Sequence, residues 1–370
     1  MAPQIVVLGA GYSGLLAAKL AARRTGAPVT LINDRERFVE RVRMHQLACG
    51  QPLAELPIRE LLTGTGVEFV AGRAVRIDAG NREITLAGRA EQLSYDLLIY
   101  ALGSHAELDS VPGAREYAHT VAGFEQARRL RDRLRAGGSV AVVGGGLTGI
   151  EAAAELAESH PDRQVRLVTG GELGAGLSAR GGRYLRRALG RLGVECHEGL
   201  QVSQVDATGL RAADDEKVLA DTVVWTAGFR VPGLAADAGF AVDGRGRMIV
   251  DPTLRSVSHP EVYGVGDAVA AHRAAGQELR MACATAIPSA QHATRAIAAR
   301  LAGRTPAPLR FRYFNQCISL GRRDGLVQFV RADDSPVEAI LTGRAAARYK
   351  EAIVRGTVFA QRHPGVTALV

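Results

Sequence analysis

The stretch Ile5-Val-Val-Leu-Gly-Ala-Gly-Tyr-Ser-Gly14, close to the N-terminus, decides the fold. Its first four residues are apolar and mostly β-branched, which predicts a strand buried in a parallel sheet. An Ala- and Leu-rich run from Gly14 to Arg23 predicts a helix, and Val29 to Ile32 predicts a strand that ends at Asn33-Asp34. A G-x-G-x-x-G turn between a strand and a helix, with a second strand after it, is typical of a dinucleotide-binding unit.

The same pattern occurs a second time, with the turn Gly144-Gly-Gly-Leu-Thr-Gly149. Ser139 to Val143 predicts the strand before this turn, Ile150 to Glu158 predicts the helix after it, and Gln164 to Val168 predicts the following strand. One such turn alone is a weak signal, but two turns that both stand between a strand and a helix indicate two dinucleotide sites.

Glycine has the same purpose in both turns. Without a Cβ atom the backbone can turn sharply and approach a pyrophosphate, which then lies at the positive end of the following helix. Electron transfer between two bound dinucleotides is the most economical reason for a protein to hold both. The alternative is that one of the two glycine turns is purely structural.

Other segments predict the rest of the fold. Three further apolar runs end in glycine turns and predict strands: Tyr95 to Gly103, Asp221 to Gly228 and Val262 to Asp267. We expect a helix from about Pro288, with the proline in its first turn, to about Leu301. The chain then continues with a linker at 304–308, strand-like runs at 309–320 and 325–330, and a closing helix at about 344–354.

The composition is that of a folded protein with more than one domain. Of the 370 residues, 47% are hydrophobic and 23% are charged, which excludes a disordered chain. The four cysteines are scattered and form no CxxC pair, so we expect neither a metal site nor a disulfide framework. We find no signal peptide and no apolar stretch of the roughly 18 residues that span a bilayer. We expect a cytoplasmic protein.

The positive charge is unevenly placed. The net charge is +8, and residues 303–370 contain eleven Arg or Lys against five Asp or Glu. This segment is either a solvated arginine-rich face or a surface that attracts an anionic partner, such as the inner face of the cell membrane. Nucleic acid is not expected as a partner, because the sequence has no aromatic-interleaved basic patch and no docking motif.

These motifs together resemble those of the two-dinucleotide-binding-domain flavoproteins, most closely the type II NADH dehydrogenases and the apoptosis-inducing-factor-like reductases. The pieces that carry the resemblance are Gly9 to Gly14, Ala101-Leu-Gly103, Gly144 to Glu151, Thr226 to Arg230 and Gly264 to Asp267. The resemblance implies an α/β fold with two Rossmann-like domains. It places FAD in residues 1–112 with 240–305, NAD(P)H in an inserted domain at 113–239, and a C-terminal interface segment at 306–370.

The resemblance also implies roles for single residues. Asp267 binds the ribityl and phosphate part of FAD, or else only caps a helix. Glu151 lies near the nicotinamide and positions it, although the helix dipole alone also explains a carboxylate there. Gln291 and His292 stand where relatives open a helix beside the flavin and the quinone, Gln291 as a hydrogen-bond donor and His292 as a proton source. The alternative for His292 is an ordinary surface histidine.

The site residues expected from these arguments fall into two groups. The catalytic group is Glu151, Gln291 and His292. The cofactor-binding group is Gly9, Gly11, Tyr12, Ser13, Gly14, Asn33, Asp34, Arg43, Gly103, Gly144, Gly146, Gly149, Gly228, Gly266 and Asp267. No metal ligand is expected.

Recognition of the two adenosine riboses is predicted differently at the two sites. Asn33 or Asp34 meets the ribose of FAD, because an acid at the end of the second strand usually does so. The equivalent place in the second unit is Thr169-Gly170, which has no acid. The choice between NADH and NADPH therefore stays open, with Arg180 and Arg183 as candidates for a 2′-phosphate.

The segment from Arg41 to Gln46 is polar and corresponds to a place where relatives bring residues against the flavin. Arg43 and His45 are candidates for such contacts, and the alternative is that they are surface residues. Cys49 is either a small buried hydrophobe or a single redox-active thiol. The disulfide reductases of this superfamily need a CxxxxC pair, which this chain lacks.

We therefore expect an FAD-dependent NAD(P)H oxidoreductase that passes a hydride to flavin N5 and then reduces a quinone or another two-electron acceptor. The closing helix is short for a membrane anchor, so a soluble reductase of an electron-carrier protein, or a tailoring redox enzyme, is the first alternative. The second is a redox-sensing scaffold of the apoptosis-inducing-factor type. A homodimer is open in each case.

Overall fold

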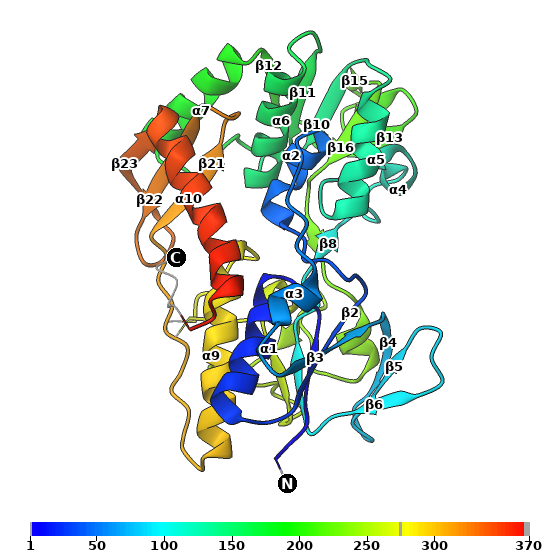
Figure 1. Cartoon of the computed structure of the whole chain (residues 1–370). Helices are drawn as coiled ribbons and strands as arrows, with labels where there is room; N and C mark the ends of the chain where they lie inside the picture. Colours follow the sequence, from blue (N-terminus) through cyan, green and yellow to red (C-terminus); the bar gives the residue numbers. More distant parts are fainter. Residues whose placement is uncertain (1, 274–275, 366–370) are drawn as a thin grey trace.

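The computed structural model describes residues 2–273 and 276–365 and contains two parallel five-stranded sheets (Figure 1). The first sheet has the order β19-β7-β1-β2-β3, and all of its neighbouring strands are parallel. Its central strand β1 is buried along its whole length, as its apolar run predicts. The strands are β1 Ile5–Leu8, β2 Val29–Asn33, β3 Val67–Ala71, β7 Leu97–Tyr100 and β19 Val262–Gly264.

Two helices pack together beside this first sheet, α1 (Tyr12–Thr25) and α9 (Cys283–Leu301) (Figure 1). α1 ends at Gly26, whose φ of 66° is the left-handed conformation that glycine adopts without strain. α9 begins five residues before Pro288, so the expectation of a proline in the first turn is wrong. The hydroxyl of Thr285 donates to the carbonyl of Ala282 in the opening turn that the sequence pattern did not reveal.

The second sheet has the order β12-β11-β10-β16-β9 and is also parallel. Its strands are β9 Ala118–His119, β10 Val140–Val143, β11 Val165–Thr169, β12 Val194–Glu198 and β16 Thr222–Trp225. The helices of this unit are α5 Phe124–Leu134, α6 Leu147–Ser159 and α7 Ala179–Arg191. The two sheets confirm the predicted α/β class with two Rossmann-like units.

The chain crosses between the two sheets twice, at β8 (His105–Ala106) and at β17 (Phe229–Arg230). These two short strands pair antiparallel with each other. After the second crossing the chain returns to the first sheet as β19, so the second sheet is an insertion into the first unit. The division at residues 112 and 239 remains a prediction.

Small antiparallel sheets complete the units: β4 Ala74–Asp78, β5 Glu83–Leu86 and β6 Gln92–Ser94 in the first, and β13 Val202–Asp206, β14 Gly209–Ala212 and β15 Lys217–Leu219 in the second.

The C-terminal segment forms an antiparallel three-stranded sheet followed by a long helix. The strands are β21 Asn315–Ser319, β22 Gly325–Val330 and β23 Pro336–Thr342. Only the last part of the predicted 309–320 run is therefore a strand. Residues 366–370 of the predicted segment lie outside the described residues.

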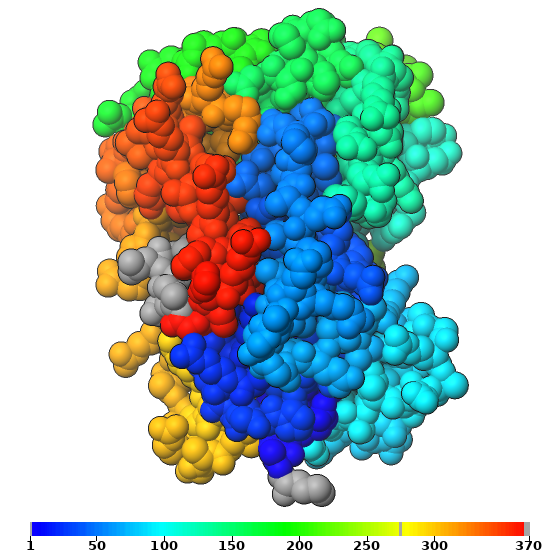
Figure 2. All heavy atoms as spheres, in the orientation of Figure 1, coloured from blue at the N-terminus to red at the C-terminus, as the bar shows by residue number. Residues whose placement is uncertain are grey.

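The final helix, α10 (Gly343–Arg362), is much longer than the predicted 344–354. Its extra turns dock on α1: the fully buried Gln361 donates from Nε2 to the carbonyl of Tyr12 at 2.8 Å, and Lys19 donates to the carbonyl of Gln361. In Figure 2, α10 is red and packs against the blue N-terminal part of the chain on one side and orange residues on the other. Among the described residues, no helix combines the length and the apolar character needed to cross a membrane.

Candidate active site

The two glycine loops open into one cavity of about 2910 Å³. In the first loop, a Cβ at Gly9 would lie 2.5 Å from the carbonyl oxygen of Ala101, and a Cβ at Gly14 would collide with the carbonyl of Gly9. A Cβ at Gly11 would meet no protein atom within 4 Å, and Gly11 lines the cavity. The outer glycines, Gly9 and Gly14, are therefore needed because a side chain at either position would collide with the protein backbone. The middle glycine, Gly11, leaves room for a phosphate to approach the backbone.

The second loop repeats this arrangement. Gly144 has a φ of 120°, and a Cβ at Gly149 would collide with its carbonyl oxygen. Gly146 again has nothing within 4 Å of its Cβ position and lines the cavity. Gly103 and Gly228, both with positive φ, line the same cavity at the ends of the strands that face the two loops.

The end of β2 braces the first loop. Asn33 accepts a hydrogen bond from the amide of Ala10 at 2.9 Å and donates to the carbonyl of Arg35 at 2.8 Å. Asp34 is exposed beside the cavity and pairs with Arg35 at 3.1 Å. Asn33 thus supports the loop, and Asp34 has a carboxylate available to a ribose.

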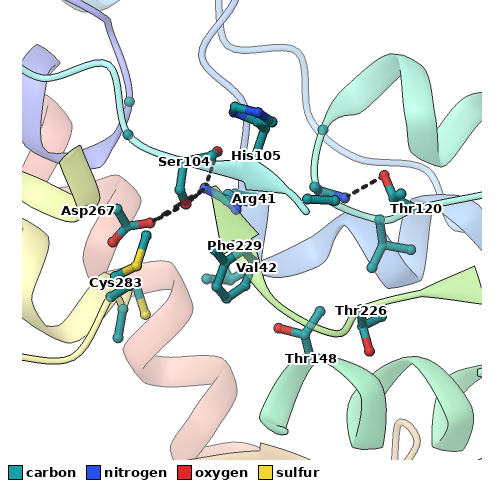
Figure 3. A pocket seen from close by; sticks show the side chains of 18 of the residues that line it. Arg41, Val42, Ser104, His105, Thr120, Thr148, Thr226, Phe229, Asp267 and Cys283 are labelled. Carbon is teal, nitrogen blue, oxygen red and sulfur yellow. Dashed lines mark hydrogen bonds and ion pairs between the residues drawn. The ribbon is translucent and has the colours of Figure 1, made fainter. Parts of the chain in front are cut away.

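The opposite wall brings together three polar residues from distant parts of the chain. Asp267 accepts a hydrogen bond from the hydroxyl of Ser104 at 2.7 Å, and Arg41 donates to the carbonyl oxygen of Ser104 at 2.8 Å (Figure 3). Arg41 Nη1 lies 3.6 Å from the Asp267 carboxylate, and the Arg41 guanidinium lies over the ring of Phe229. Figure 3 shows Thr148 and Thr226 of the second unit across from this cluster.

Arg41 is the cofactor-facing residue that the sequence did not single out. Burial lowers the pKa of Arg41, against the opposing effect of Asp267. Its Nη2 atom is buried and has no hydrogen-bond partner among residues 2–273 and 276–365. An unpaired guanidinium nitrogen and a phosphate-sized space at Gly11 fit an anionic cofactor such as FAD.

Arg43, which the sequence analysis preferred, does not face the cavity. It donates to Glu40 at 3.0 Å, to Gln46 at 3.1 Å and to Glu351 of α10 at 2.9 Å. Arg41 and Arg43 lie at the two ends of the short helical turn η1 (Arg41–Arg43), which is followed by α2 (Met44–Ala48). Their side chains therefore point in different directions. Arg43 therefore ties α10 to the first unit, and His45 from the same segment does line the cavity.

Gln291 and His292 also lie away from the main cavity. Gln291 lines a separate cavity of about 230 Å³ between α1 and α9, and its carbonyl accepts from Arg24 at 2.7 Å. The cause is the early start of α9: Gln291 is eight residues beyond Cys283, about 12 Å along the axis. The residues before and at the start of α9 line the main cavity instead, namely Arg280, Met281, Ala282, Cys283, Ala284 and Ala286.

Glu151 lies at the cavity wall and is almost completely buried. It accepts a hydrogen bond from the backbone amide of Ser319 at 2.9 Å and one from the ammonium group of Lys350 on α10. Lys350 also donates to the carbonyl of Cys317 at 3.2 Å. Burial, followed by the nearby Arg43, lowers the pKa of Lys350 to about 7. Nothing in the sequence near Glu151 reveals Lys350, because 198 residues separate them.

At the end of β11, where the second adenosine ribose is expected, the cavity-lining residues of the described chain are uncharged. Thr169, Gly170, Gly171 and Gln201 line the cavity there, whereas Arg180 and Arg183 do not. The Gln201 amide lies directly over Gly170. Arg180 and Arg183 are on α7, where the backbone amide of Arg180 bonds to Glu338 at 3.1 Å.

Cys49 is not part of the cavity. Burial and the neighbouring Glu155 raise the pKa of its thiol to about 12, which disfavours the reactive thiolate. Cys283 and Cys317 do line the cavity, and the sequence analysis assigned them no role. Burial raises the pKa of Cys317 to about 12 as well.

A family model described as pyridine nucleotide-disulphide oxidoreductase matches residues 3–296. The chain belongs to this pyridine nucleotide-disulphide oxidoreductase family. An NADH dehydrogenase-like protein of Mycobacterium tuberculosis is 33% identical over 300 residues, which cover 72% of this chain and 73% of the relative. The type II NADH:quinone oxidoreductase of Staphylococcus haemolyticus is 27% identical over 396 residues, which cover 96% of this chain and 95% of the relative.

Solved structures of this oxidoreductase family share the fold. The sulfide:quinone oxidoreductase of Aquifex aeolicus superposes with a TM-score of 0.84 at 19% identity, covering 98% of this chain and 92% of that chain. NDH2 of Plasmodium falciparum in complex with NADH gives 0.83 at 15% identity, covering 98% of each chain. Family membership confirms the expected class of enzyme, an oxidoreductase that uses FAD and a nicotinamide dinucleotide.

Proposed function

We propose that this enzyme oxidises NAD(P)H and delivers the two electrons to a quinone. The observation that carries the proposal is the single cavity that reaches from Gly11 past Asp267 to Gly146. Two dinucleotides bound at loops that share one cavity can meet end to end, which direct transfer requires. Bound FAD supplies the two-electron chemistry. The type II NADH:quinone oxidoreductase and NADH dehydrogenase-like relatives support this assignment.

Different residues of the chain bind different parts of the two cofactors. Gly11 and Gly146 admit the two pyrophosphates to the positive ends of α1 and α6. Asp267, Ser104 and Arg41 hold the middle part of the flavin cofactor. The positive end of α9 faces the cavity and favours a negative charge there.

Glu151 acts as a positioning residue for the nicotinamide in this proposal. The contacts from Lys350 and from the Ser319 amide fix its carboxylate at the cavity wall. A carboxylate held in this way can orient an amide group of a substrate by accepting a hydrogen bond from it.

The C-terminal segment supports a quinone as the acceptor. Four of its aromatic side chains are well exposed and line the cavity: Phe314 at 64%, Phe329 at 37%, Tyr349 at 37% and Phe359 at 50%. Large apolar side chains beside an open cavity suit a flat apolar ring. Exposed arginines of the same segment, including Arg310, Arg312 and Arg344, would attract an anionic membrane surface in which quinones dissolve.

Turnover with a soluble quinone tests the proposal. We expect the purified protein to oxidise NADH or NADPH continuously in the presence of menadione. Reduction of the flavin without turnover would favour the redox-sensing scaffold. Turnover only with an electron-carrier protein would favour the carrier reductase, for which the ferredoxin reductase of Rhodopseudomonas palustris is a structural neighbour with a TM-score of 0.75.

A further inference from the structure

A second buried carboxylate, Glu155, lies one turn beyond Glu151 on α6 and is fully buried. Residues four apart on a helix lie on the same face, with Cβ atoms about 5–6 Å apart. Glu155 accepts a hydrogen bond from the side-chain amide of Gln51, and its Oε2 atom has no partner among the described residues. The positioning of the nicotinamide makes no use of this carboxylate.

His45 lies on the helix that packs against this face of α6. α2 contacts α6, and the amide of Cys49 bonds to the carbonyl of His45, so both residues lie on one side of α2. Burial, followed by the charges of Lys350, Arg322 and Arg43, lowers the pKa of His45 to about 3, so His45 is neutral at pH 7. Burial, followed by the charge of Glu155, raises the pKa of Cys49 to about 12. His45 is buried, lines the cavity and has an Nε2 atom without a partner in the described chain.

The outer end of this row of polar groups reaches the surface. Arg322, an exposed residue in the turn between β21 and β22, acts electrostatically on both His45 and Glu155. Its backbone amide donates to Glu158, the next carboxylate on α6, at 2.6 Å. Outward along α6 from the cavity wall, the groups are Glu151 with Lys350, then Glu155 with Gln51, then Glu158 with the backbone amide of Arg322.

The proposed reaction needs such a route, and the inference rests on that proposed function. The balanced reaction is NAD(P)H plus quinone plus one proton giving NAD(P)⁺ plus quinol. The hydride carries two electrons and one proton, so the second proton comes from solvent. A quinone bound against the exposed aromatic side chains displaces water from its part of the cavity, and a buried acid can then supply this proton through the protein.

We propose that Glu155 is the proton-transfer residue that links the Glu151–Lys350 pair to solvent during reduction of the acceptor. It holds a proton between turnovers, passes it inward along α6 to the Glu151–Lys350 pair, and regains one from the side of Gln51 and Arg322.

The electrostatics of the cluster suit this role. Burial raises the pKa of Glu155 to about 7, Arg322 opposes the rise, Glu158 adds to it, and the hydrogen bond from Gln51 opposes it. Lys350, with its pKa lowered to about 7, is matched to Glu155, and proton transfer is efficient between groups of similar pKa near the working pH. On α2's side of the row, Arg43 is paired with Glu40 and Glu351.

The test separates the two half-reactions in Glu155→Gln, which keeps the size of the side chain and removes its proton exchange. Stopped-flow reduction of the flavin by NADH should match wild type, because hydride transfer consumes no solvent proton. Reoxidation by menadione should slow by about a hundredfold at pH 7, at the low end of the usual effect of a proton-transfer group. Glu155→Asp should recover part of the rate.

Two further variants make the test specific. Gln51→Leu removes the donor that lowers the pKa of Glu155, so the pH midpoint of reoxidation should shift upward, which a merely structural role would not cause. Glu125→Gln changes an exposed acid on α5 and should behave as wild type.

Thermal unfolding gives a readout independent of turnover. A buried acid with a raised pKa destabilises the folded state as pH rises from its unfolded pKa to its folded pKa. The melting temperature of Glu155→Gln relative to wild type should therefore increase between about pH 4.5 and 7.

Reoxidation of Glu155→Gln at the wild-type rate with an unchanged pH profile would overturn the proton route while leaving the proposed function intact. Failure of the wild-type flavin to pass electrons to menadione at all would instead overturn the proposed function.

Discussion

At the scale of single residues, the glycines of the two loops are needed for different reasons at different positions. Gly9 and Gly14 are glycines because protein atoms crowd their Cβ positions, whereas Gly11 and Gly146 are glycines although their Cβ positions are open. Open space beside a helix N-terminus on a cavity wall is reserved for a ligand. The same substitution must therefore have different effects at the outer and middle glycines.

Gly11→Val and Gly146→Val form a matched pair that tests this. Both variants should fold, because a Cβ atom at either position meets no protein atom within 4 Å. Gly11→Val should be purified without flavin. Gly146→Val should remain yellow but bind NADH more weakly by about tenfold or more, the effect of a clash worth about 1.4 kcal/mol. Absorbance spectra and NADH titrations measure both, and a Gly11→Val protein with full flavin content would contradict the assignment of the first loop.

Glu151→Gln tests the positioning role. The variant should raise the KM for the nicotinamide or slow flavin reduction, because a neutral amide no longer pairs with Lys350. Loss of one partner from a fully buried ion pair commonly costs about 3–5 kcal/mol, so its folding is checked first by thermal unfolding. Wild-type values of both kinetic parameters in a folded variant would exclude a role for Glu151 in binding.

Local motifs in the sequence predicted the parts of the site that depend on neighbouring residues. The glycine loops, Asp267 and Glu151 all line the cavity, since each follows directly from a strand end or a helix start. Arg41, Ser104 and Lys350 were missed because only tertiary contacts bring each of them to the site. Gln291 and His292 were misplaced because the start of α9 at Cys283 has no capping residue that reveals it.

At the scale of elements, α10 is the helix whose predicted bounds differ most from the structure. Its predicted apolar stripe is weak because several of its inward residues are polar: Thr357 and Gln361 are buried, Lys350 is mostly buried, and all three are hydrogen-bonded. A helix held by polar contacts to specific partners cannot be recognised from hydrophobic periodicity. The predicted strands of the two parallel sheets, in contrast, lie within a few residues of their expected bounds, because they are short apolar runs. No such prediction was made for β3, β9 and β12 of the same sheets.

The ion pair between Arg43 and Glu351 fixes α10 to the first unit. Arg43→Met should lower the free energy of unfolding by about 1–3 kcal/mol, less than for a fully buried pair because Glu351 is partly exposed. Flavin binding should not change, since Arg43 does not line the cavity. Denaturant unfolding and the flavin spectrum provide the two measurements, and loss of flavin from a folded variant would restore Arg43 as a cofactor ligand.

The same pair predicts a pH dependence. Burial raises the pKa of Glu351, but hydrogen bonds from Arg43 and Arg355 lower it by more, so the pKa lies below its ordinary value. The resulting stabilisation is present above the unfolded pKa and is lost as pH falls through the folded pKa. The stability difference between wild type and Arg43→Met should therefore shrink below about pH 4.5, and a constant difference would show that Glu351 is not the partner that matters.

At the scale of the whole molecule, the C-terminal segment connects both dinucleotide units and borders their shared cavity. Its aromatic and arginine-rich surface predicts peripheral binding to anionic vesicles. Flotation with phosphatidylserine-containing liposomes should recover the protein at low salt and lose it at high salt, because surface charge is screened within about 10 Å at 0.1 M. Equal recovery with neutral liposomes would argue against an electrostatic contact.

The central claim is that two dinucleotides share one cavity closely enough for a hydride to pass between them. Anaerobic titration of the purified protein with NADH, and separately with NADPH, tests it most directly. We predict a yellow protein whose long-wavelength flavin absorbance disappears with about one equivalent of at least one of the two nucleotides. A colourless protein that takes up no FAD, or a flavin that neither nucleotide bleaches, would contradict the claim.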